Sequence, residues 1–278
     1  MKRTAMIVVG IVVAVAVGAA ILVRRSRQAL RFPYLAAALT EERYRALAGR
    51  AGWQAHALDV GNQTLLRGLV RAPRKPDSPW LLFFTGNSAT SLEDGQRCLA
   101  GLAEPDDLGA AVFAYRGYDG NPGKPSPEAL QSDGLLAYAE LANKLGAKKI
   151  HVVGFSLGPT LAAFVAAHGN QPKPSSLTLL APTTELDMGK KTDLFLHRYE
   201  TLKYLPEISS KTLVVHGTKD ATLPVDGART IVKQLGERGQ FVEPPELGHF
   251  DLCEAPAVAE LVRRFVAERS GSSGPAAP

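Results

Sequence analysis

A serine between two glycines is the first group in this sequence with the setting of a nucleophile. Ser156 lies in Gly154-Phe-Ser-Leu-Gly158, after a short β-branched run and before an apolar segment of helical pattern. Glycines at this spacing leave room for the strained strand-to-helix turn that presents a nucleophilic serine. The unpaired N–H groups and the dipole at a helix start favour developing negative charge there. The pattern predicts Ser156 as a catalytic nucleophile; the alternative is a glycine-rich turn with an inert serine.

Such a nucleophile needs a base that accepts its proton and an acid that orients the base. His249 lies in a Gly-His-Phe turn between the last predicted strand and the last predicted helix, where a loop can present it at the carboxyl edge of a sheet. We therefore predict His249 as the base. His151 within a strand, His168 at a helix end and His216 at a strand end are interpreted as structural.

The acid is expected directly after a strand that lies between the serine and the histidine in the sequence. Asp220 meets this condition, because it closely follows the predicted strand Thr212 to His216. We predict that Asp220 orients the base. Three acidic residues after the preceding strand are the alternatives: Glu185, Asp187 and Asp193.

Attack on an acyl carbon creates an oxyanion, which needs hydrogen-bond donors worth about 3 to 4 kcal/mol each. The backbone N–H of Leu157, directly after the nucleophile, is the first predicted donor. The second is expected from the glycine turn Thr85 to Ser88, with the N–H of Asn87 as the candidate. The alternative is that this segment is only a glycine turn.

Strands and helices alternate from Trp80 onward, which predicts a mostly parallel central sheet with helices on both faces. The Gly61-Asn62 pair predicts a hairpin ahead of it. The expected strands are Gln54 to Asp59, Thr64 to Arg71, Trp80 to Thr85, Ala110 to Tyr115, Lys149 to Val153, Leu177 to Leu180, Thr212 to His216 and Gln240 to Glu243. The expected helices are Thr40 to Arg50, Leu92 to Ala103, Pro127 to Leu145, Ser156 to Ala167, Pro224 to Gly236 and Ala255 to Arg269. The short segment between Leu180 and Thr212 leaves room for only a minimal lid.

The N-terminal region predicts a transmembrane anchor. Met6 to Val23 contains no charged residue, is bracketed by basic residues and is just long enough to span a bilayer as a helix. A cleaved signal peptide is the alternative, with Ala14-Val-Ala16 as its cleavage site. Basic residues on both flanks leave the side of the membrane open. The expected organisation is a flank at 1–5, an anchor at 6–23, a basic linker with a short helix at 24–52, a catalytic domain at 53–269 and a disordered tail at 270–278.

Composition narrows the class of protein. The chain has 278 residues, of which 45% are hydrophobic and 21% charged, as is typical of one globular domain with appendages. Residues 1 to 75 hold 13 of the 32 Lys and Arg but 3 of the 27 acidic residues, which favours an anionic membrane surface over nucleic acid as a partner. Cys98 and Cys253 lie far apart and in no metal-like spacing, so we expect no disulfide framework.

Four stretches together resemble the α/β-hydrolase-fold serine hydrolases, in particular the membrane-anchored abhydrolase-domain-containing proteins, over residues 54 to 268. They are Phe84-Thr-Gly-Asn87, Ala114-Tyr-Arg-Gly-Tyr118 with Gly123-Lys-Pro-Ser126, Gly154-Phe-Ser-Leu-Gly158, and His216-Gly-Thr-Lys-Asp220 with Gly248-His249. The resemblance implies that fold, a Ser-His-Asp triad and cleavage of a carboxylic ester, thioester or amide. Two positions depart from the family pattern: Thr85 stands where the family usually has His, and Pro159 where a small Gly is common.

These observations predict a single-pass, membrane-tethered serine hydrolase that cleaves a carboxylic ester or thioester through an acyl-enzyme on Ser156. Its substrate is expected to be a small-molecule or lipid-like acyl compound, and the mechanism needs no metal or organic cofactor. A catalytically silent scaffold that binds a partner at the membrane is the first alternative, favoured by Thr85. An acyltransferase or a peptidase that uses the same triad is the second. The sequence does not indicate an oligomeric state.

Overall fold

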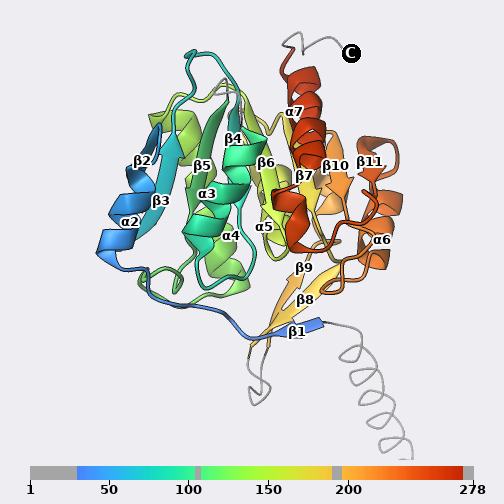
Figure 1. The fold of residues 1–278 in the computed structure, drawn as a ribbon, viewed down its shortest axis with the longest axis horizontal. Coiled ribbons are helices and arrows are strands. Elements are labelled where there is room, and N and C mark those ends of the chain that lie inside the picture. The colour runs from blue at the N-terminus through green and yellow to red at the C-terminus, as the bar shows by residue number, and fades with distance from the viewer. Residues whose placement is uncertain (1–29, 104–107, 190–195, 272–278) are drawn as a thin grey trace, which may run out of the picture.

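An eight-stranded sheet forms the centre of the domain in the computed structural model, which describes residues 30–103, 108–189 and 196–271 (Figure 1). Its strand order is β11-β10-β7-β6-β4-β5-β3-β2. β3 is antiparallel to both β2 and β5, and all other neighbouring strands in the sheet are parallel. The strands are β2 (Trp53–Asp59), β3 (Leu65–Arg71), β4 (Trp80–Phe84), β5 (Gly109–Phe113), β6 (Ile150–Phe155), β7 (Ser176–Leu180), β10 (Thr212–Val215) and β11 (Gly239–Val242). The predicted mostly parallel sheet and its leading hairpin are confirmed.

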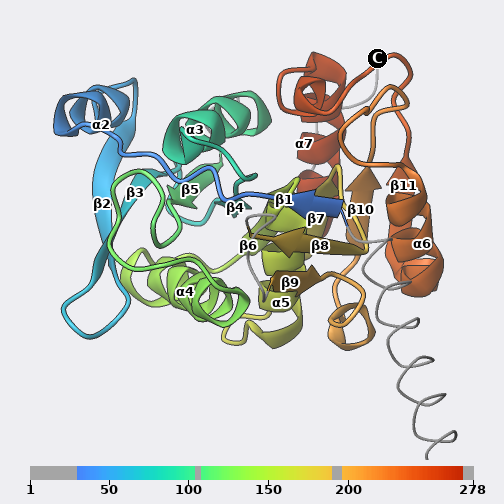
Figure 2. The same cartoon turned by 90° about the horizontal axis from the view of Figure 1, so that it is seen from below.

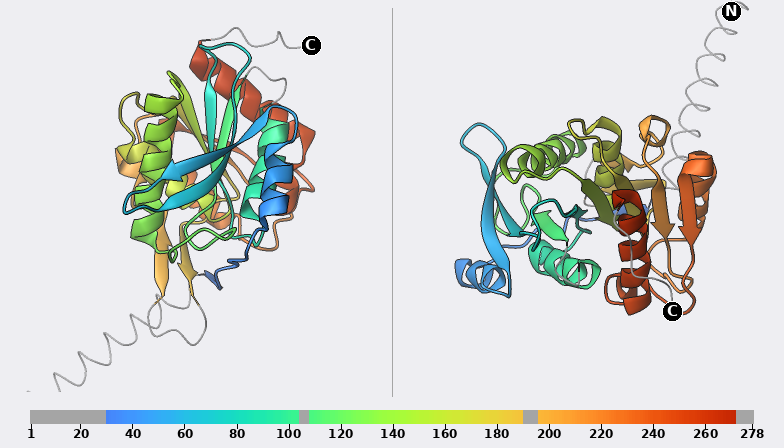
Figure 3. Two further views of the ribbon diagram at one scale, coloured as in Figure 1. Left: turned by 90° about the vertical axis from the view of Figure 1, so that its left-hand side faces the viewer. Right: turned by 90° about the horizontal axis from the view of Figure 1, so that it is seen from above.

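Helices cover both faces of this sheet, as predicted (Figures 2 and 3). On one face lie α2 (Glu41–Ala48), α3 (Ser91–Leu102) and α7 (Pro256–Ser270); on the other lie α4 (Pro127–Ala139), α5 (Gly158–His168) and α6 (Asp226–Leu235). Short helical turns are η1 (Glu140–Lys144), η2 (Leu205–Glu207), η3 (Gly236–Arg238) and η4 (Phe250–Cys253). Every residue of β4, β5, β7 and β10 is buried. This burial follows from the helices on both sides, because side chains on both faces of these strands pack into an apolar core.

A second, three-stranded sheet lies beside the main one and departs from the predicted pattern (Figure 1). It consists of β1 (Leu30–Phe32), β8 (Glu185–Met188) and β9 (His197–Glu200), with β1 parallel and β9 antiparallel to β8. β8 begins shortly after the carboxyl end of β7, so the small sheet stands at the edge where the predicted site residues lie. Strands of three or four residues are too short for an alternating pattern to identify them. β1 falls within the predicted linker at 24–52.

Some predicted segments lie outside the described residues. The predicted anchor, Met6 to Val23, and residues 272–278 of the predicted tail are among them. Within the described part of the chain, no helix has the length and apolar character needed to cross a bilayer. Helix α7 continues to Ser270, one residue into the predicted tail, where the buried Ser270 hydroxyl donates a hydrogen bond to the Val266 carbonyl (2.8 Å).

A disulfide joins α3 to η4, and the expectation of no disulfide framework is wrong. Cys98 and Cys253 are separated by 155 residues in the sequence, but their Cα atoms lie 4.6 Å apart. Spacing along the chain gave no reason to pair them, because the fold alone brings α3 against η4. The bond fixes the turn that directly follows His249 to the body of the domain.

Removing this disulfide is expected to destabilise the domain. A bond that closes a loop of 155 residues restricts the unfolded chain by an amount equivalent to about 5 kcal/mol in the chain-entropy model. Urea unfolding of the Cys98→Ala/Cys253→Ser variant should give that loss, and wild type in reductant should match it. The single Cys253→Ser variant is the control, since it should lose as much as the double variant. Equal stability of wild type with and without reductant would contradict the disulfide.

Candidate active site

Ser156 occupies a sharp turn between β6 and α5. Its φ is 60°, in the left-handed region, and its N–H donates to the Leu180 carbonyl at 3.1 Å. The two flanking glycines are sterically required. A Cβ on Gly158 would lie 2.0 Å from the Phe84 carbonyl oxygen, and a Cβ on Gly154 would lie 2.6 Å from the backbone of Gly158. Sequence and packing therefore agree on a nucleophile elbow.

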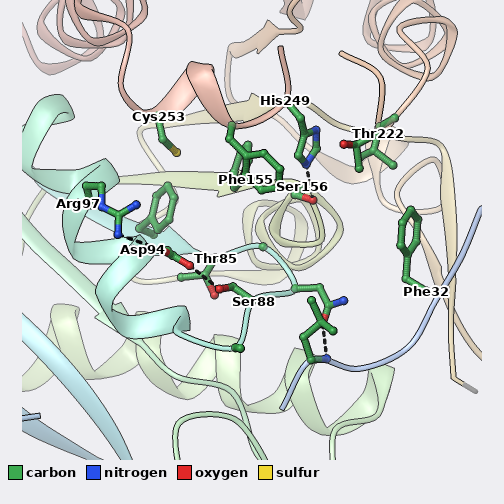
Figure 4. Close-up of a pocket in the computed structure, with 18 of the residues that line it drawn as sticks. Phe32, Thr85, Ser88, Asp94, Arg97, Phe155, Ser156, Thr222, His249 and Cys253 are labelled. Carbon is green, nitrogen blue, oxygen red and sulfur yellow. Dashed lines mark hydrogen bonds and ion pairs between the residues drawn. The ribbon is translucent and has the colours of Figure 1, made fainter. Parts of the chain in front are cut away.

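Three predicted site residues meet at the carboxyl edge of the sheet. His249 Nε2 lies 2.9 Å from Ser156 Oγ, and His249 Nδ1 lies 2.7 Å from Asp220 Oδ2. Figure 4 shows the imidazole of His249 directed at the serine hydroxyl. With Nδ1–H donated to the carboxylate, Nε2 is the nitrogen available to accept the serine proton. This arrangement can activate a serine; the catalytic role of each residue stays a prediction.

The Asp220 carboxylate is buried and fully engaged. Oδ1 accepts hydrogen bonds from the backbone N–H groups of Thr222 and Leu223, both at 2.8 Å. His216 Nε2, 3.3 Å from Oδ2, also donates to the Leu223 carbonyl at 2.9 Å. Burial alone raises the pKa of Asp220, but hydrogen bonds from His216, His249 and the Leu223 N–H outweigh it and hold the pKa well below its usual range. The carboxylate therefore stays ionised beside the imidazole.

The alternative acids have other partners or positions. Asp187, in β8, forms a two-bond ion pair with Arg198, at 2.9 and 3.2 Å. Glu185 lies 3.8 Å from the same guanidinium. Asp193 lies outside the described residues. Of the described candidates, Asp220 is the acid in hydrogen-bond contact with His249.

The loop after β4 lies against the nucleophile. A Cβ on Gly86 would be 3.1 Å from Ser156 Cβ, and Asn87 lines the same cavity as Ser156. The Asn87 side chain is occupied elsewhere: its Oδ1 accepts from the Leu35 N–H (2.9 Å) and the Tyr118 hydroxyl (2.7 Å). Its Nδ2 donates to the carbonyl of residue 33 at 2.9 Å. These contacts direct the Asn87 side chain toward the N-terminal segment and Tyr118, and the backbone N–H of Asn87 stays the predicted oxyanion donor.

Both departures from the family pattern fit the local structure. Thr85 is 1% exposed, and its methyl group packs so closely on α3 that a Cβ on Gly95 would lie 2.8 Å away. The Thr85 carbonyl accepts a hydrogen bond from the Tyr115 hydroxyl at 2.8 Å. Pro159 lies in the first turn of α5, where its missing N–H costs no helix hydrogen bond. Thr85 is thus a core residue at the base of the loop.

A mostly apolar cavity of about 430 Å³ opens beside Ser156 and His249. Its apolar lining includes Phe32, Leu35, Phe155, Leu186, Met188 and Leu223. Figure 4 shows Phe32 and Phe155 on either side of the Ser156 and His249 pair. Asp94 and Arg97, 3.3 Å apart, supply a charged pair on the α3 side. Within residues 30–103, 108–189 and 196–271, no group of three or more His, Cys, Asp and Glu side chains is arranged to hold a metal ion.

Two of the lining residues belong to the segment Leu30 to Leu35, which we call the N-terminal strap. The sequence predicts this segment as part of a linker and does not indicate its contribution to the cavity. Phe32 and Leu35 line the cavity, and the Tyr34 hydroxyl lies 3.0 Å from that of Tyr199 in β9. The apolar residues of this segment do alternate with others from Leu30 to Tyr34, but the run is too short for that pattern to identify a strand.

Comparisons with known proteins agree with this architecture. No known family profile matches the chain. An uncharacterised protein of Mycobacterium tuberculosis is 30% identical over 173 residues, which are 58% of this chain and 60% of the relative. The alpha/beta hydrolase domain-containing protein aho-3 of Caenorhabditis elegans is 24% identical over 240 residues, 79% of this chain and 70% of that protein. Lysophosphatidylserine lipase ABHD12 of Danio rerio is 26% identical over 156 residues, 51% of this chain and 40% of the lipase.

Two solved structures show the same fold. Est1E from Butyrivibrio proteoclasticus superposes with a TM-score of 0.61 at 18% identity, over 78% of this chain and 99% of Est1E. The chain has the α/β-hydrolase fold. A membrane phospholipase A described as a bacterial virulence factor superposes on this chain with a TM-score of 0.63 at 18% identity, over 98% of this chain and 100% of the phospholipase. This chain spans 60% of the length of the mycobacterial relative.

The close packing at the elbow generates a stability prediction. Gly158→Ala should lower the free energy of unfolding by roughly 1–3 kcal/mol, because the new methyl overpacks against the end of β4. Gly101→Ala in α3 is the matched control: its Cβ would come no closer than 3.7 Å to another residue, so it should be neutral or stabilise by up to about 1 kcal/mol. Urea unfolding measures both, and equal effects would count against the packing described.

Proposed function

We propose that this chain is a serine hydrolase that cleaves a carboxylic ester or thioester through an acyl-enzyme on Ser156. The observation that carries the proposal is the hydrogen-bonded series of Ser156, His249 and Asp220, with distances of 2.9 and 2.7 Å, at one wall of an apolar cavity. The esterase and lipase names among its structural and sequence relatives support the same class of reaction.

The reaction follows from this geometry. His249 Nε2 takes the proton of Ser156 as the serine oxygen attacks the acyl carbon, and the Asp220 carboxylate stabilises the imidazolium that forms. When the tetrahedral intermediate collapses, His249 returns the proton to the departing alkoxide or thiolate, which leaves as alcohol or thiol. Water then gives a proton to His249 and attacks the acyl-enzyme. In the second collapse His249 returns this proton to Ser156 Oγ, which restores the serine and releases the carboxylic acid.

The developing oxyanion is assigned to two backbone donors, the N–H groups of Leu157 and Asn87. Leu157 precedes the first residue of α5, so its N–H benefits from the positive end of the helix dipole. The Asn87 loop is held by the three hydrogen bonds of its own side chain. Donors fixed before substrate binds need no reorganisation during reaction, which is the source of their effect on rate.

The substrate is proposed to carry an apolar acyl chain. The cavity next to the nucleophile is lined mainly by aliphatic and aromatic side chains, and its volume is in the range of small-molecule sites. The lysophosphatidylserine lipase and the membrane phospholipase A act, by their names, on lipid esters. An amphiphilic ester or thioester with its chain in this cavity fits both observations.

The chain is further proposed to be a single-pass membrane protein. The support is the uncharged run Met6 to Val23 with basic residues on both sides. Arginines at 24, 25, 27 and 31 would lie at the headgroup level of such an anchor, where anionic lipids attract them.

Fluorophosphonate labelling tests the hydrolase proposal directly. The detergent-solubilised wild type should be labelled, because a fluorophosphonate reacts only with an activated serine. Ser156→Ala should remove the attacked atom and His249→Ala the base, so both variants should lose labelling. His168→Ala, a histidine at the far end of α5, is the matched control and should label like wild type. A folded wild type that does not react would favour the silent scaffold.

The Asp220 assignment predicts a separate kinetic result. Asp220→Asn should lower kcat by about 10⁴-fold, since the amide favours the wrong tautomer of the base. Asp226→Asn is the control, because Asp226 is exposed and pairs with Arg229 at 3.3 Å; its kcat should stay within about twofold of wild type. Stopped-time assays with a chromogenic short-chain ester measure both. A loss below tenfold for Asp220→Asn would mean that another acid orients the histidine.

A further inference from the structure

The cavity mouth carries half of the large exposed apolar side chains found among the described residues. These side chains are Leu35 (47% exposed), Leu65 (55%), Leu136 (37%) and Phe250 (72%). Leu35 and Phe250 line the cavity beside Ser156, whereas Leu65 and Leu136 do not. Because Leu35 and Phe250 are both exposed and part of the lining, they form the rim through which a substrate enters.

Both rim residues are held in place although their side chains face outward. Leu35 ends the strap, and its backbone N–H donates to Asn87 Oδ1 at 2.9 Å. Phe250 starts η4, which the disulfide to Cys98 ties to α3. The Phe250 ring stands edge-on to the imidazole of His249, with ring centroids 5.1 Å apart. Exposed apolar side chains on fixed backbone at the entrance of an apolar cavity mark a contact surface.

The position of the strap in the sequence limits what this surface can contact. Leu30 follows Val23, the last residue of the predicted anchor, by seven residues, so the two Cα atoms lie at most about 25 Å apart. On the proposed anchor, the strap would lie close to the bilayer surface. Three arginines of this short connection and the exposed Arg31 add charge that anionic headgroups attract.

The charged groups of the cavity do not disrupt this apolar rim. Arg97 pairs with Asp94 at 3.3 Å and with Glu254 at 3.6 Å, on the α3 side. The opposite wall is made by the strap and by Leu186 and Met188 of the small sheet. The cavity thus has one paired, charged side and one apolar side that continues to Leu35.

We propose that Leu35 and Phe250 insert into the lipid interface and seat the mouth of the cavity on the bilayer. An acyl substrate would then pass from the membrane into the cavity without crossing water. The inference rests on the proposed anchor and, for its consequence, on the proposed hydrolase activity. The partner that contacts the rim is therefore lipid. If a protein partner covered this surface instead, neither side chain would reach the acyl chains of the bilayer.

Fluorescence quenching by lipid tests the insertion without any assay of activity. The full chain is reconstituted into phosphatidylcholine and phosphatidylglycerol vesicles whose acyl chains carry bromine near the headgroup. The two native tryptophans, Trp53 and Trp80, are 6% and 4% exposed and provide a constant background. Phe250→Trp and Leu35→Trp should be quenched at least about twofold more than Leu65→Trp, an exposed control that does not line the cavity. Equal quenching of all three variants would overturn the proposal.

A kinetic comparison tests the consequence and separates it from the proposed function. The Leu35→Ser/Phe250→Ser variant should lower the ratio of hydrolysis of a bilayer-embedded long-chain ester to hydrolysis of a water-soluble short ester by about tenfold. Leu65→Ser should leave the ratio unchanged. An equal loss on both esters would make the two residues mere cavity wall and overturn docking. A wild type that fails to label with fluorophosphonate would refute the hydrolase activity, while the quenching result would still decide the insertion.

Discussion

The close approach of α5 to the end of β4 is the constraint on which the site depends. Main chain packs on main chain there, since Gly158 presents no side chain to the Phe84 carbonyl. The same contact brings the loop after β4 against Ser156, within reach of Gly86. The nucleophile and the proposed oxyanion donors therefore share one rigid junction, and their spacing does not depend on side-chain rotamers. Positioning of this kind supplies a large part of the rate enhancement of an enzyme.

Charge at the site is fixed in a similar way. Asp220 is an anion enclosed by two backbone N–H groups and two imidazoles. Burial of a carboxylate is costly unless such partners replace water, and here they lower the pKa of Asp220 rather than letting burial raise it. The turn that follows His249 is anchored by the disulfide. Base and acid are thus held from two independent directions.

The sequence was informative where local pattern determines structure. Ser156, Asp220 and His249 follow predicted strands, and parallel strands bring their carboxyl ends to one edge, so their meeting could be predicted without coordinates. The small sheet could not, because β1 and β8 pair across more than half the chain and each is only three or four residues long. The Cys98–Cys253 disulfide and the hydrogen bonds of the Asn87 side chain to the strap could not be predicted for the same reason. Contacts between distant residues with no periodic pattern leave no trace in a single sequence.

The hydrogen bonds of the Asn87 side chain tie the strap to the loop beside the nucleophile, and this affects where the structural unit around the site begins. Its side chain binds the strap on one side and Tyr118 on the other, and the strap supplies Phe32 and Leu35 to the cavity. A chain trimmed to start at helix α2 would keep the triad but lose one wall of its pocket and two ties on the loop beside the nucleophile. In modular terms, the strap belongs to the same structural unit as the proposed active site, and a domain definition that begins at α2 would cut through the cavity wall.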